Sequence, residues 1–312
     1  MTTFLVTGGA GFIGSTLAEA LLAQGDTVRI LDDFSSGRRS NVEALHGKLD
    51  VLEGTIVDEA TVQRAMQGVE IVFHEAAIPS VPRSVEKPQA SMLANVQGTT
   101  VVLDVARRSG VKRVVFAASS SAYGDTPTLP KIETMTPQPK SPYAISKLAG
   151  EQLLTSFATL YGLETVSLRY FNVFGPRQDP TSQYAAVIPN FVTAALAGKK
   201  PTVFGDGEQT RDFCFIENVV RANIQAATTP KKLRGEVVNI ACGERISLNQ
   251  LLAIIGEETA TKVEAEYGPA RAGDVRDSLA SIDAARELFG YDPKVKVRDG
   301  LKKTIAAMRA RG

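Results

Sequence analysis

The stretch TGGAGFIG, residues 7–14, follows a short apolar run at residues 4–7 and leads into a pattern of helical spacing. Glycines at such a strand-to-helix junction let the backbone turn, approach a pyrophosphate closely and pack the helix against the strand. The first turn of the helix also offers free N–H groups and the positive end of its dipole to phosphates. A purely structural turn would need the same glycines, so the rest of the pattern has to decide between the two.

An acidic pair follows at the distance that a nucleotide site requires. Asp32 and Asp33 lie 18 and 19 residues after Gly14, at the end of a strand predicted at residues 27–31. A carboxylate at this place can accept hydrogen bonds from the ribose hydroxyls of an adenosine, and it repels the 2′-phosphate of NADP. Strand, glycines, helix and acid in this order predict a site for NAD. Arg38 and Arg39 follow closely in sequence. Their positive charges slightly weaken the prediction of NAD over NADP.

The first half of the chain alternates β-branched runs with helical patterns. Further strands are predicted at residues 70–73, 111–117 and 164–169, and apolar residues such as Ile13, Leu17 and Leu21 repeat at helical spacing. This alternation is typical of a parallel sheet with crossover helices. The sequence therefore predicts an α/β fold with a doubly wound, Rossmann-type parallel sheet.

After Arg169 the elements become shorter and are broken by Gly and Pro, which predicts a smaller C-terminal α/β lobe. A helix at about residues 217–227 and a strand at residues 236–240 are regular enough to return to the first sheet. The expected division is an NAD-binding domain of residues 1–170 plus about 215–241. About 171–214 plus 242–312 would then form a substrate-binding lobe.

Composition and charge exclude several classes of protein. The 312 residues are 44% apolar and carry 35 basic against 34 acidic side chains, so no chain-wide field favours nucleic acid or an anionic membrane. The two Cys and two His residues are too few and too far apart for a structural zinc site or a disulfide scaffold, so no metal site is expected. Neither a signal peptide nor a membrane span is indicated, and a cytoplasmic location is expected.

A catalytic set follows the strand predicted at residues 111–117. Ser119 comes directly after it, and Tyr143 and Lys147 lie four residues apart, on one face of a predicted helix. A nearby cation stabilises a phenolate, so Lys147 could make Tyr143 a base while Ser119 holds a substrate hydroxyl. Alone, such a pair is more often a surface contact. A nucleophilic serine is not indicated, because His46 and His74 lie far upstream and no G-x-S-x-G turn is present.

Four strings together resemble the extended short-chain dehydrogenase/reductases. They are TGGAGFIG at residues 7–14, SSSAYG at 119–124, YAISK at 143–147 and RYFNVFGP at 169–176. The strings SVPRS at 80–84, QYAAVIP at 183–189 and GDGEQTRDF at 205–213 are similar to those of UDP-hexose 4-epimerases, and most similar to the bacterial UDP-N-acetylglucosamine 4-epimerase type. The resemblance implies oxidation of the sugar 4-hydroxyl and return of the hydride to the other face of a 4-keto intermediate.

The resemblance also implies which residues surround the two ligands. Thr55 departs from the pattern, because relatives often carry an acid there, near the adenine. The catalytic residues would be Ser119, Tyr143 and Lys147. The residues expected at the cofactor are Gly8, Gly11, Phe12, Ile13, Gly14, Asp32, Asp33, Ser36, Gly37, Ile56, Ala76, Ala77, Asn95, Tyr143, Lys147 and Tyr170. Those expected at the substrate are Ser80, Ser119, Ser121, Tyr143, Asn172, Ala186, Val187, Phe204, Arg211, Arg271, Asp274 and Ser278.

The sugar itself stays open at this point. Ser278 lies where epimerases confined to unacetylated sugars carry a bulky aromatic, so space for an N-acetyl group favours UDP-GlcNAc and UDP-GalNAc. UDP-glucose, UDP-glucuronate and a decarboxylase reaction remain alternatives. A dehydratase is disfavoured because Ser120 and Ser121 stand where such enzymes carry an Asp-Glu pair, and a catalytically idle NAD-sensing protein is disfavoured by the intact catalytic set.

Relatives commonly form a homodimer through two helices. The corresponding helices here are expected at about residues 87–108 and 143–160, each with an apolar face. A symmetric dimer with a four-helix contact is therefore expected.

Overall fold

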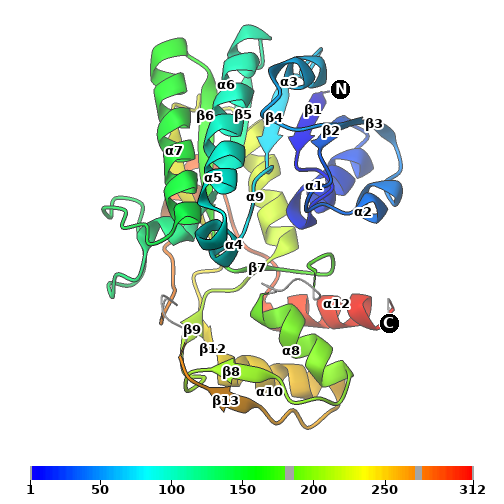
Figure 1. The fold of residues 1–312 in the computed structure, drawn as a ribbon, viewed down its shortest axis with the longest axis vertical. Helices are drawn as coiled ribbons and strands as arrows, with labels where there is room; N and C mark the ends of the chain where they lie inside the picture. Colours follow the sequence, from blue (N-terminus) through cyan, green and yellow to red (C-terminus); the bar gives the residue numbers. More distant parts are fainter. Residues whose placement is uncertain (1, 180–185, 271–275, 311–312) are drawn as a thin grey trace.

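Seven parallel strands form the central sheet in the computed structural model, which describes residues 2–179, 186–270 and 276–310 (Figure 1). Their order across the sheet is β11-β6-β5-β4-β1-β2-β3. This order reverses between β1 and β4, which is the switch point at which open α/β sheets bind ligands. The predicted doubly wound α/β fold is confirmed. The strands are β1 (Thr3–Thr7), β2 (Thr27–Asp32), β3 (Lys48–Glu53), β4 (Ile71–His74), β5 (Arg113–Ser119), β6 (Glu164–Tyr170) and β11 (Glu236–Ile240).

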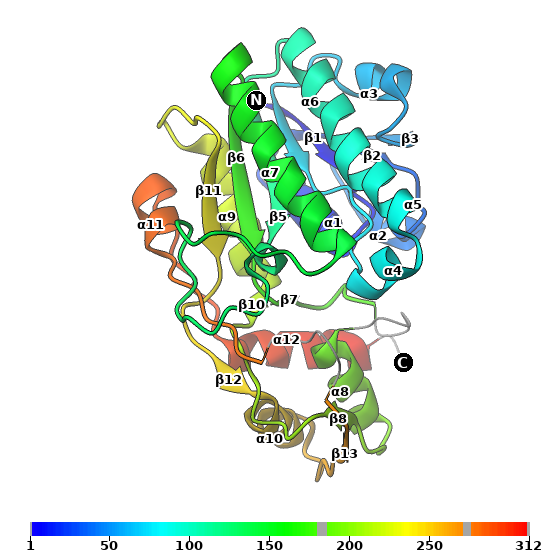
Figure 2. The same ribbon diagram turned by 60° about the vertical axis from the view of Figure 1, so that its left-hand side comes forward.

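Helices cover both faces of this sheet. Because alternate side chains of a strand point to opposite faces, Phe4 and Val6 of β1 lie in one buried cluster and Leu5 lies in another. The first cluster includes Leu17 of α1 and Val219 of α9. The second is formed with α3, α6 and α7, and Figure 2 shows α6 and α7 side by side on that face. The helices are α1 (Phe12–Ala23), α2 (Arg39–Glu43), α3 (Glu59–Ala65), α6 (Gly98–Arg108), α7 (Pro142–Tyr161) and α9 (Ile216–Thr228).

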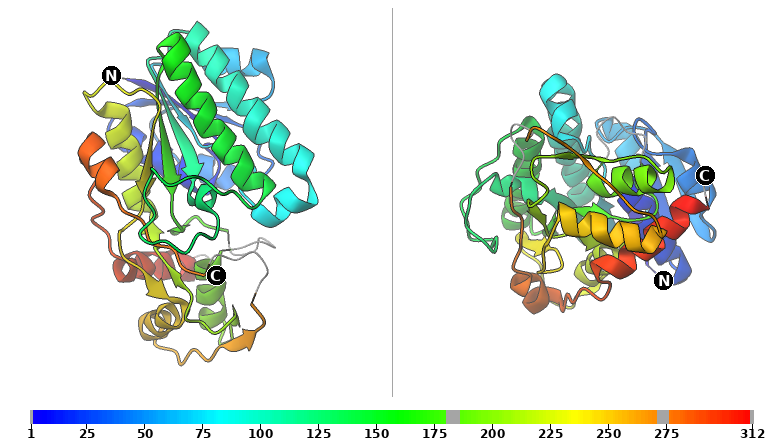
Figure 3. Two further views of the ribbon diagram at one scale, coloured as in Figure 1. Left: turned by 90° about the vertical axis from the view of Figure 1, so that its left-hand side faces the viewer. Right: turned by 90° about the horizontal axis from the view of Figure 1, so that it is seen from below.

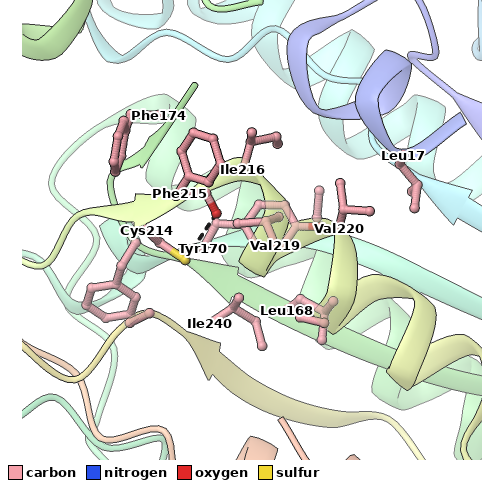
Figure 4. Close-up of a cluster of buried hydrophobic side chains, with 14 of the residues drawn as sticks. Leu17, Leu168, Tyr170, Phe174, Cys214, Phe215, Ile216, Val219, Val220 and Ile240 are labelled. Atoms are coloured by element: carbon pink, nitrogen blue, oxygen red, sulfur yellow. Dashed lines mark hydrogen bonds between the residues drawn. The ribbon is translucent and has the colours of Figure 1, made fainter. Parts of the chain in front are cut away.

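The packing of α9 shows how the chain returns to the sheet after entering the smaller lobe. Val219 and Val220 of this helix lie against the sheet residues Leu168 of β6 and Ile240 of β11 (Figure 4). Removing the apolar surface of these side chains from water is the main contribution to the stability of this contact between helix and sheet. The segment 216–240 therefore completes the larger lobe, although it follows the first part of the smaller lobe in sequence.

The helix α7 has well-defined ends. The Ser141 side chain caps its start by accepting a hydrogen bond from the N–H of Ala144 at 3.1 Å, and Pro142 occupies the first helical position. At its end Gly162 adopts a left-handed conformation with φ 70°, which terminates the helix without steric cost. These caps hold Tyr143 in the first turn of α7, facing the carboxyl ends of the strands.

Helical structure beside α7 contains a π-helical turn, which is uncommon. The stretch after β4 consists of α4 (Val81–Glu86), α5 (Pro88–Met92), the π-helical turn Leu93–Gln97 and then α6. The wider turn places Asn95 in the buried region next to α7. Such single π turns are frequent at functional sites.

One strand of the central sheet was not predicted from the sequence. The edge strand β3 has the sequence KLDVLE, in which polar residues alternate with apolar ones, and Val51 is itself 40% exposed. Charged residues on an edge strand prevent pairing with other molecules but remove the apolar run that marks a buried strand. Pairing with β2 over six residues decides its conformation.

The smaller lobe lies beyond the carboxyl ends of the sheet strands (Figure 3, left). Within the described residues it is built from pairs of short strands: β10 with β7 and β13 with β8 are parallel, and β12 with β9 is antiparallel. The helix α11, which the sequence analysis placed in the smaller lobe, contacts β11. The elements are β7 (Val173–Phe174), α8 (Val187–Leu196), β8 (Thr202–Phe204), β9 (Thr210–Arg211), β10 (Cys214–Phe215), β12 (Ile246–Ser247), α10 (Leu248–Thr259), β13 (Glu266–Gly268), α11 (Asp283–Phe289) and α12 (Val297–Arg309).

Candidate active site

The glycine turn packs backbone against backbone. Gly8 has φ 72°, and a Cβ at this residue would lie 2.7 Å from the Cα and N of Ala76, after β4. A Cβ at Gly14 would lie 2.3 Å from the carbonyl oxygen of Gly8. Gly11 is the N-cap of α1, so no side chain caps this helix and its first N–H groups stay available for phosphates. The turn thus has the cradle and the donors that a pyrophosphate needs.

A cavity of about 410 Å³ opens in front of this turn, at the carboxyl ends of β1 to β4. Twelve of the residues expected at the cofactor line it: Gly8, Gly11, Phe12, Ile13, Gly14, Asp32, Asp33, Ser36, Gly37, Ile56, Ala76 and Ala77. Thr55, which departs from the family pattern, and Ala186, expected at the substrate, also line it. Volume, position and donors all fit a dinucleotide.

Asp32 joins the turn to the loop after β2. Its Oδ2 atom accepts a hydrogen bond from the N–H of Ala10 at 2.9 Å, and its Oδ1 atom accepts one from the N–H of Phe34 at 2.8 Å. Burial raises the pKa of this carboxyl, and the two N–H groups oppose that rise. Each carboxylate oxygen has a second lone pair, so ribose hydroxyls can still bind to Asp32.

The two arginines after β2 have carboxylate partners. Arg38 forms an ion pair with Asp179 at 2.5 Å. Arg39 pairs with Glu53 at 2.7 Å and lies over the ring of Phe34, 4.1 Å from its centroid. Both cations are thereby paired with protein carboxylates. The site fits NAD, because Asp32 can accept hydrogen bonds from ribose hydroxyls and repels a 2′-phosphate.

Ser119 and Tyr143 meet at the end of β5. Two groups donate to the Oγ atom of Ser119: the Ser121 hydroxyl at 2.9 Å and the Ser121 N–H at 3.2 Å. A hydrogen bond with Ser119 lowers the pKa of Tyr143, whereas burial, the larger effect, raises it. Since the Ser119 oxygen already accepts twice, its own proton is free to go to the Tyr143 oxygen. The pKa of Tyr143 is raised on balance by its burial, and the hydrogen bond from Ser119 is the contact that favours its phenolate.

Lys147 lies one turn further along α7 and is only 3% exposed. Its Nζ atom donates to the carbonyl oxygen of Ala117 at 2.7 Å and lies 4.9 Å from the ring centroid of Phe116. Burial lowers the pKa of this ammonium to about 8, and the carboxylates of Glu75 and Glu151 oppose the decrease. Lys147 therefore still carries its charge at neutral pH, close to Tyr143.

Asn95 and Tyr170 were expected at the cofactor, and the structure places both in hydrogen-bond networks behind the cavity. The Nδ2 atom of Asn95 donates to Ser146 at 2.9 Å, and Ser146 donates to the carbonyl oxygen of Tyr143 at 2.8 Å. The Oδ1 atom of Asn95 accepts from the N–H of Ile78 at 2.8 Å. Asn95 thus ties the loop after β4 to the first turn of α7.

His74 is a buried structural residue at the end of β4. Its Nδ1 atom is 2.8 Å from the Thr7 hydroxyl, and its Nε2 atom is 2.9 Å from the Thr99 hydroxyl. Burial lowers its pKa to about 3, so the ring is neutral. Both ring nitrogens are engaged within the protein, between β1 and α6.

Side chains from distant parts of the chain meet beyond the end of β6, among the residues expected at the substrate. Asn172, just after β6, adopts an unusual φ of 31°, and its Nδ2 atom donates to the Asp212 carbonyl oxygen and to the Ser278 Oγ atom, each at 3.0 Å. The Asp212 N–H also donates to Ser278, at 3.2 Å. Non-glycine residues with positive φ occur mainly where the surrounding structure enforces them, often at functional sites.

The remaining residues expected at the substrate come from separate elements. Ser80 caps α4, Val187 begins α8, Phe204 ends β8 and Arg211 ends β9, where its Nη1 atom donates to the carbonyl oxygen of Arg276 at 2.8 Å. Arg271 and Asp274 lie outside the described residues.

Several residues at the site were missed by the sequence analysis. Ser84 accepts a hydrogen bond from the N–H of Tyr143 at 3.0 Å and so positions this residue. The SVPRS string at residues 80–84 contains Ser84, but the sequence analysis named only Ser80 from this string as a site residue. The cavity lining that was not predicted consists of Ser35, Gly54, Glu75, Ile78, Pro79, Ala94, Gln178 and Asp179. Glu75 directly follows a strand of the sheet, a position that by itself points to the carboxyl edge.

Two absences hold for the part of the chain that the structure describes. Its His, Cys, Asp and Glu side chains include no group of three or more that could hold a metal ion. None of its helices combines the length and the apolar character that crossing a membrane requires.

Comparison with known proteins shows the family of this chain. Residues 4–241 match the NAD dependent epimerase/dehydratase family. A UDP-glucose 4-epimerase of Mycolicibacterium smegmatis is 40% identical over 309 residues, 98% of each chain. The solved UDP-N-acetylglucosamine 4-epimerase of Methanobrevibacter ruminantium M1, in complex with UDP-N-acetylmuramic acid, is 36% identical with a TM-score of 0.94, covering 100% of this chain and 99% of that one. The UDP-glucuronic acid 4-epimerase of Bacillus cereus, in complex with UDP-glucuronic acid and NAD, is 30% identical with a TM-score of 0.93 over both whole chains.

Proposed function

This chain belongs to the NAD dependent epimerase/dehydratase family, and from that premise we propose that it interconverts UDP-sugars at carbon 4, with UDP-GlcNAc and UDP-GalNAc as its preferred pair. The observation that carries the proposal is the convergence of Ser119, Tyr143 and Lys147 at the carboxyl edge of the sheet, beside the NAD cavity. A redox-neutral reaction regenerates the cofactor in each turnover, which agrees with a cofactor held in a deep cleft.

The protein's own residues handle the proton and the sugar. When bound, NAD accepts a hydride from carbon 4 of the sugar and returns it. Tyr143 takes the proton of the 4-hydroxyl, and Ser119 stabilises the phenolate by its hydrogen bond. To hold that hydroxyl as well, Ser119 would release the hydrogen bond that it accepts from the Ser121 hydroxyl, which frees one lone pair. The ammonium of Lys147 favours the phenolate by its charge. After the 4-keto sugar has turned, Tyr143 returns the proton.

The smaller lobe is proposed to hold the UDP moiety. Arg211 and Arg271 would bind the diphosphate, because guanidinium groups form forked hydrogen bonds with phosphates. Asn172 was expected to bind it too, but both hydrogens of its amide are donated to the Asp212 carbonyl oxygen and to the Ser278 Oγ atom, so its proposed role is to position Ser278. Ala186, Val187 and Phe204 would surround the uracil. Ser278 would face the 2-substituent of the sugar, where its small side chain leaves room for an N-acetyl group.

The direct test is to incubate the purified protein separately with UDP-GlcNAc, UDP-glucose and UDP-glucuronate and to identify the products by NMR. We expect UDP-GalNAc to form fastest. Turnover of UDP-glucose alone, or of UDP-glucuronate alone, would contradict the preference while leaving the 4-epimerase chemistry intact. Conversion of none of the three would contradict both.

We also propose a homodimer through the helices beside the site. Exposed apolar side chains gather on α4, the π-helical turn and α7, where Val85 is 63%, Leu93 56% and Ile145 46% exposed. Contacts join α7 to both α4 and the π-helical turn, and Figure 2 shows α4 and α7 on the same side of the sheet. Light scattering at micromolar concentration should give twice the chain mass of 33.3 kDa, and Leu93→Asp should shift the protein toward the monomer. A wild-type monomer would contradict the dimer.

A further inference from the structure

Glu75 is a carboxyl group inside the NAD cavity that the steps above do not use. It directly follows β4 and lines the cavity. Its N–H donates to the carbonyl oxygen of Thr7 at 3.1 Å, and its Oε1 atom accepts a hydrogen bond from the Tyr170 hydroxyl at 2.7 Å. Tyr170 is held in turn by Asn223, whose Nδ2 atom donates to its oxygen at 2.8 Å. Three elements, β4, β6 and α9, therefore fix the place of this carboxyl.

The position of Glu75 along the cavity follows from its charged neighbours. Its charge acts on both Tyr143 and Lys147, so it lies at the end of the cavity where the proton is transferred. The opposite end is marked by Asp32 and the arginine pairs. Hydride and proton leave adjacent atoms of the sugar, so the reacting ring of the cofactor has to lie at the Tyr143 end.

Few charges are present to balance this carboxyl. Burial raises the pKa of Glu75 to about 7, and the Tyr170 hydroxyl and the ammonium of Lys147 oppose the rise. His74, the preceding residue, is neutral, as its lowered pKa shows. Lys147 is thus the cation whose charge acts on Glu75, and Glu151 acts on the same ammonium. A further positive charge at this end would stabilise the ionised carboxyl.

We propose that Glu75 is a charge-balancing residue whose carboxylate stabilises the cationic, oxidised nicotinamide ring over the neutral, reduced ring. With the ring oxidised and Tyr143 ionised, two positive groups face two negative ones. Once the hydride has reached the ring and the hydroxyl proton has reached Tyr143, only Glu75 and Lys147 remain charged. Glu75 therefore favours return of the hydride to the sugar, and it keeps the resting cofactor oxidised.

The test is a redox titration of the holoprotein with dithionite and mediator dyes, in which the near-ultraviolet band of the reduced nicotinamide reports the bound NADH to NAD ratio. Glu75→Gln keeps the side-chain length and an acceptor for Tyr170 but removes the charge. At equal potential and neutral pH we expect this variant to hold roughly tenfold more reduced cofactor than the wild type. Glu75→Asp, which restores the charge, should move the ratio back toward the wild type.

A matched control is available at the other end of the same strand, β4. Glu70 lies at the opposite end of β4, where it pairs with Lys112 at 2.6 Å on the surface. Glu70→Gln should leave the ratio unchanged. Equal ratios for Glu75→Gln and the wild type, or failure of Glu75→Asp to restore the ratio, would overturn the proposal.

A second measurement needs no variant. Reduction of the ring alone takes up one proton, so at fixed potential the ratio changes tenfold per pH unit. If Glu75 takes a further proton from water when the ring loses its charge, the pH dependence of the wild-type NADH to NAD ratio should become steeper. Near pH 7 it should approach a hundredfold change per pH unit. Tyr143, Lys147 and Tyr170 lie at the same end of the cavity as Glu75. Any proton that these three residues take up on reduction would still be taken up in Glu75→Gln. A wild-type dependence of tenfold throughout would contradict the proposal. Because no sugar is present, this result is independent of the proposed substrate.

Discussion

The nucleotide end and the sugar end of the site are built from different kinds of contact. At the nucleotide end the backbone itself makes the site: Gly8 packs on the backbone of Ala76, and the uncapped N–H groups of α1 face the cavity. At the proposed sugar end, the side chains of Asn172 and Ser278, more than a hundred residues apart in sequence, meet each other and the backbone of Asp212. A backbone site tolerates little change, whereas a side-chain site can be altered one residue at a time. The cofactor should therefore be common to relatives whose sugars differ.

The largest effect is expected where the two ends meet. Tyr143→Phe keeps the ring and removes the ionisable oxygen, so turnover should fall by roughly 10²-fold or more while substrate affinity changes little. Steady-state kinetics with the preferred sugar check this. Near-normal turnover would show that Tyr143 is not the base, and the roles of Ser119 and Lys147 would fall with it.

The backbone character of the nucleotide end is tested by a pair of glycines with the same φ of 72°. A Cβ at Gly8 would collide with Ala76, whereas a Cβ at Gly68 would meet nothing within 4 Å. We expect Gly8→Ala to lower the free energy of unfolding by roughly 3 kcal/mol and to lose bound NAD, and Gly68→Ala to lower it by about 1 kcal/mol.

Denaturant unfolding, together with analysis of the nucleotide released from purified protein, measures both effects. The wild type should release NAD or NADH without added cofactor. Equal losses in the two variants would show that the left-handed backbone, and not the close approach to Ala76, is responsible. NADP in the wild-type extract would contradict the role given to Asp32.

A side-chain site should change its preference through a single residue. Ser278→Tyr fills the space proposed for the N-acetyl group, so turnover of UDP-GlcNAc should fall by roughly 50-fold relative to that of UDP-glucose. Ser278→Ala is the control, because it removes the acceptor used by Asn172 and the Asp212 N–H but leaves the space open. An equal loss for both sugars in the Tyr variant would remove Ser278 as the residue that selects the sugar.

The smallest effect is expected from the hydrogen bond that Ser119 makes to Tyr143. This bond lowers the pKa of Tyr143, so Ser119→Ala should raise it and move the acidic limb of the turnover profile to higher pH. At neutral pH turnover should fall by roughly tenfold, and part of it should return as the pH rises. A parallel profile, lowered equally at every pH, would mean that Ser119 acts only on the substrate.

Prediction from the sequence succeeded where neighbours along the chain make the site. The glycine turn and Asp32 lie within short stretches whose spacing defines their geometry, and twelve of the predicted cofactor positions line one cavity. Tyr143 and Lys147 lie one turn apart on α7, and their catalytic roles stay a prediction. The strand β3 was missed because its exposed, charged edge lacks an apolar run. The placement of Asn95 and Tyr170 behind the cavity also escaped prediction, since it depends on a π-helical turn and on packing of α9.

By itself, the sequence determined the α/β fold class and the glycine turn of the nucleotide cavity, because periodicity and local spacing specify both. Only the tertiary structure decided which distant side chains meet. It placed Glu75 beside Lys147 and Tyr170, and it joined Asn172 to Ser278 across more than a hundred residues. The physical reason is that burial and electrostatic coupling arise between elements packed against each other, and spacing within one element carries no information about them.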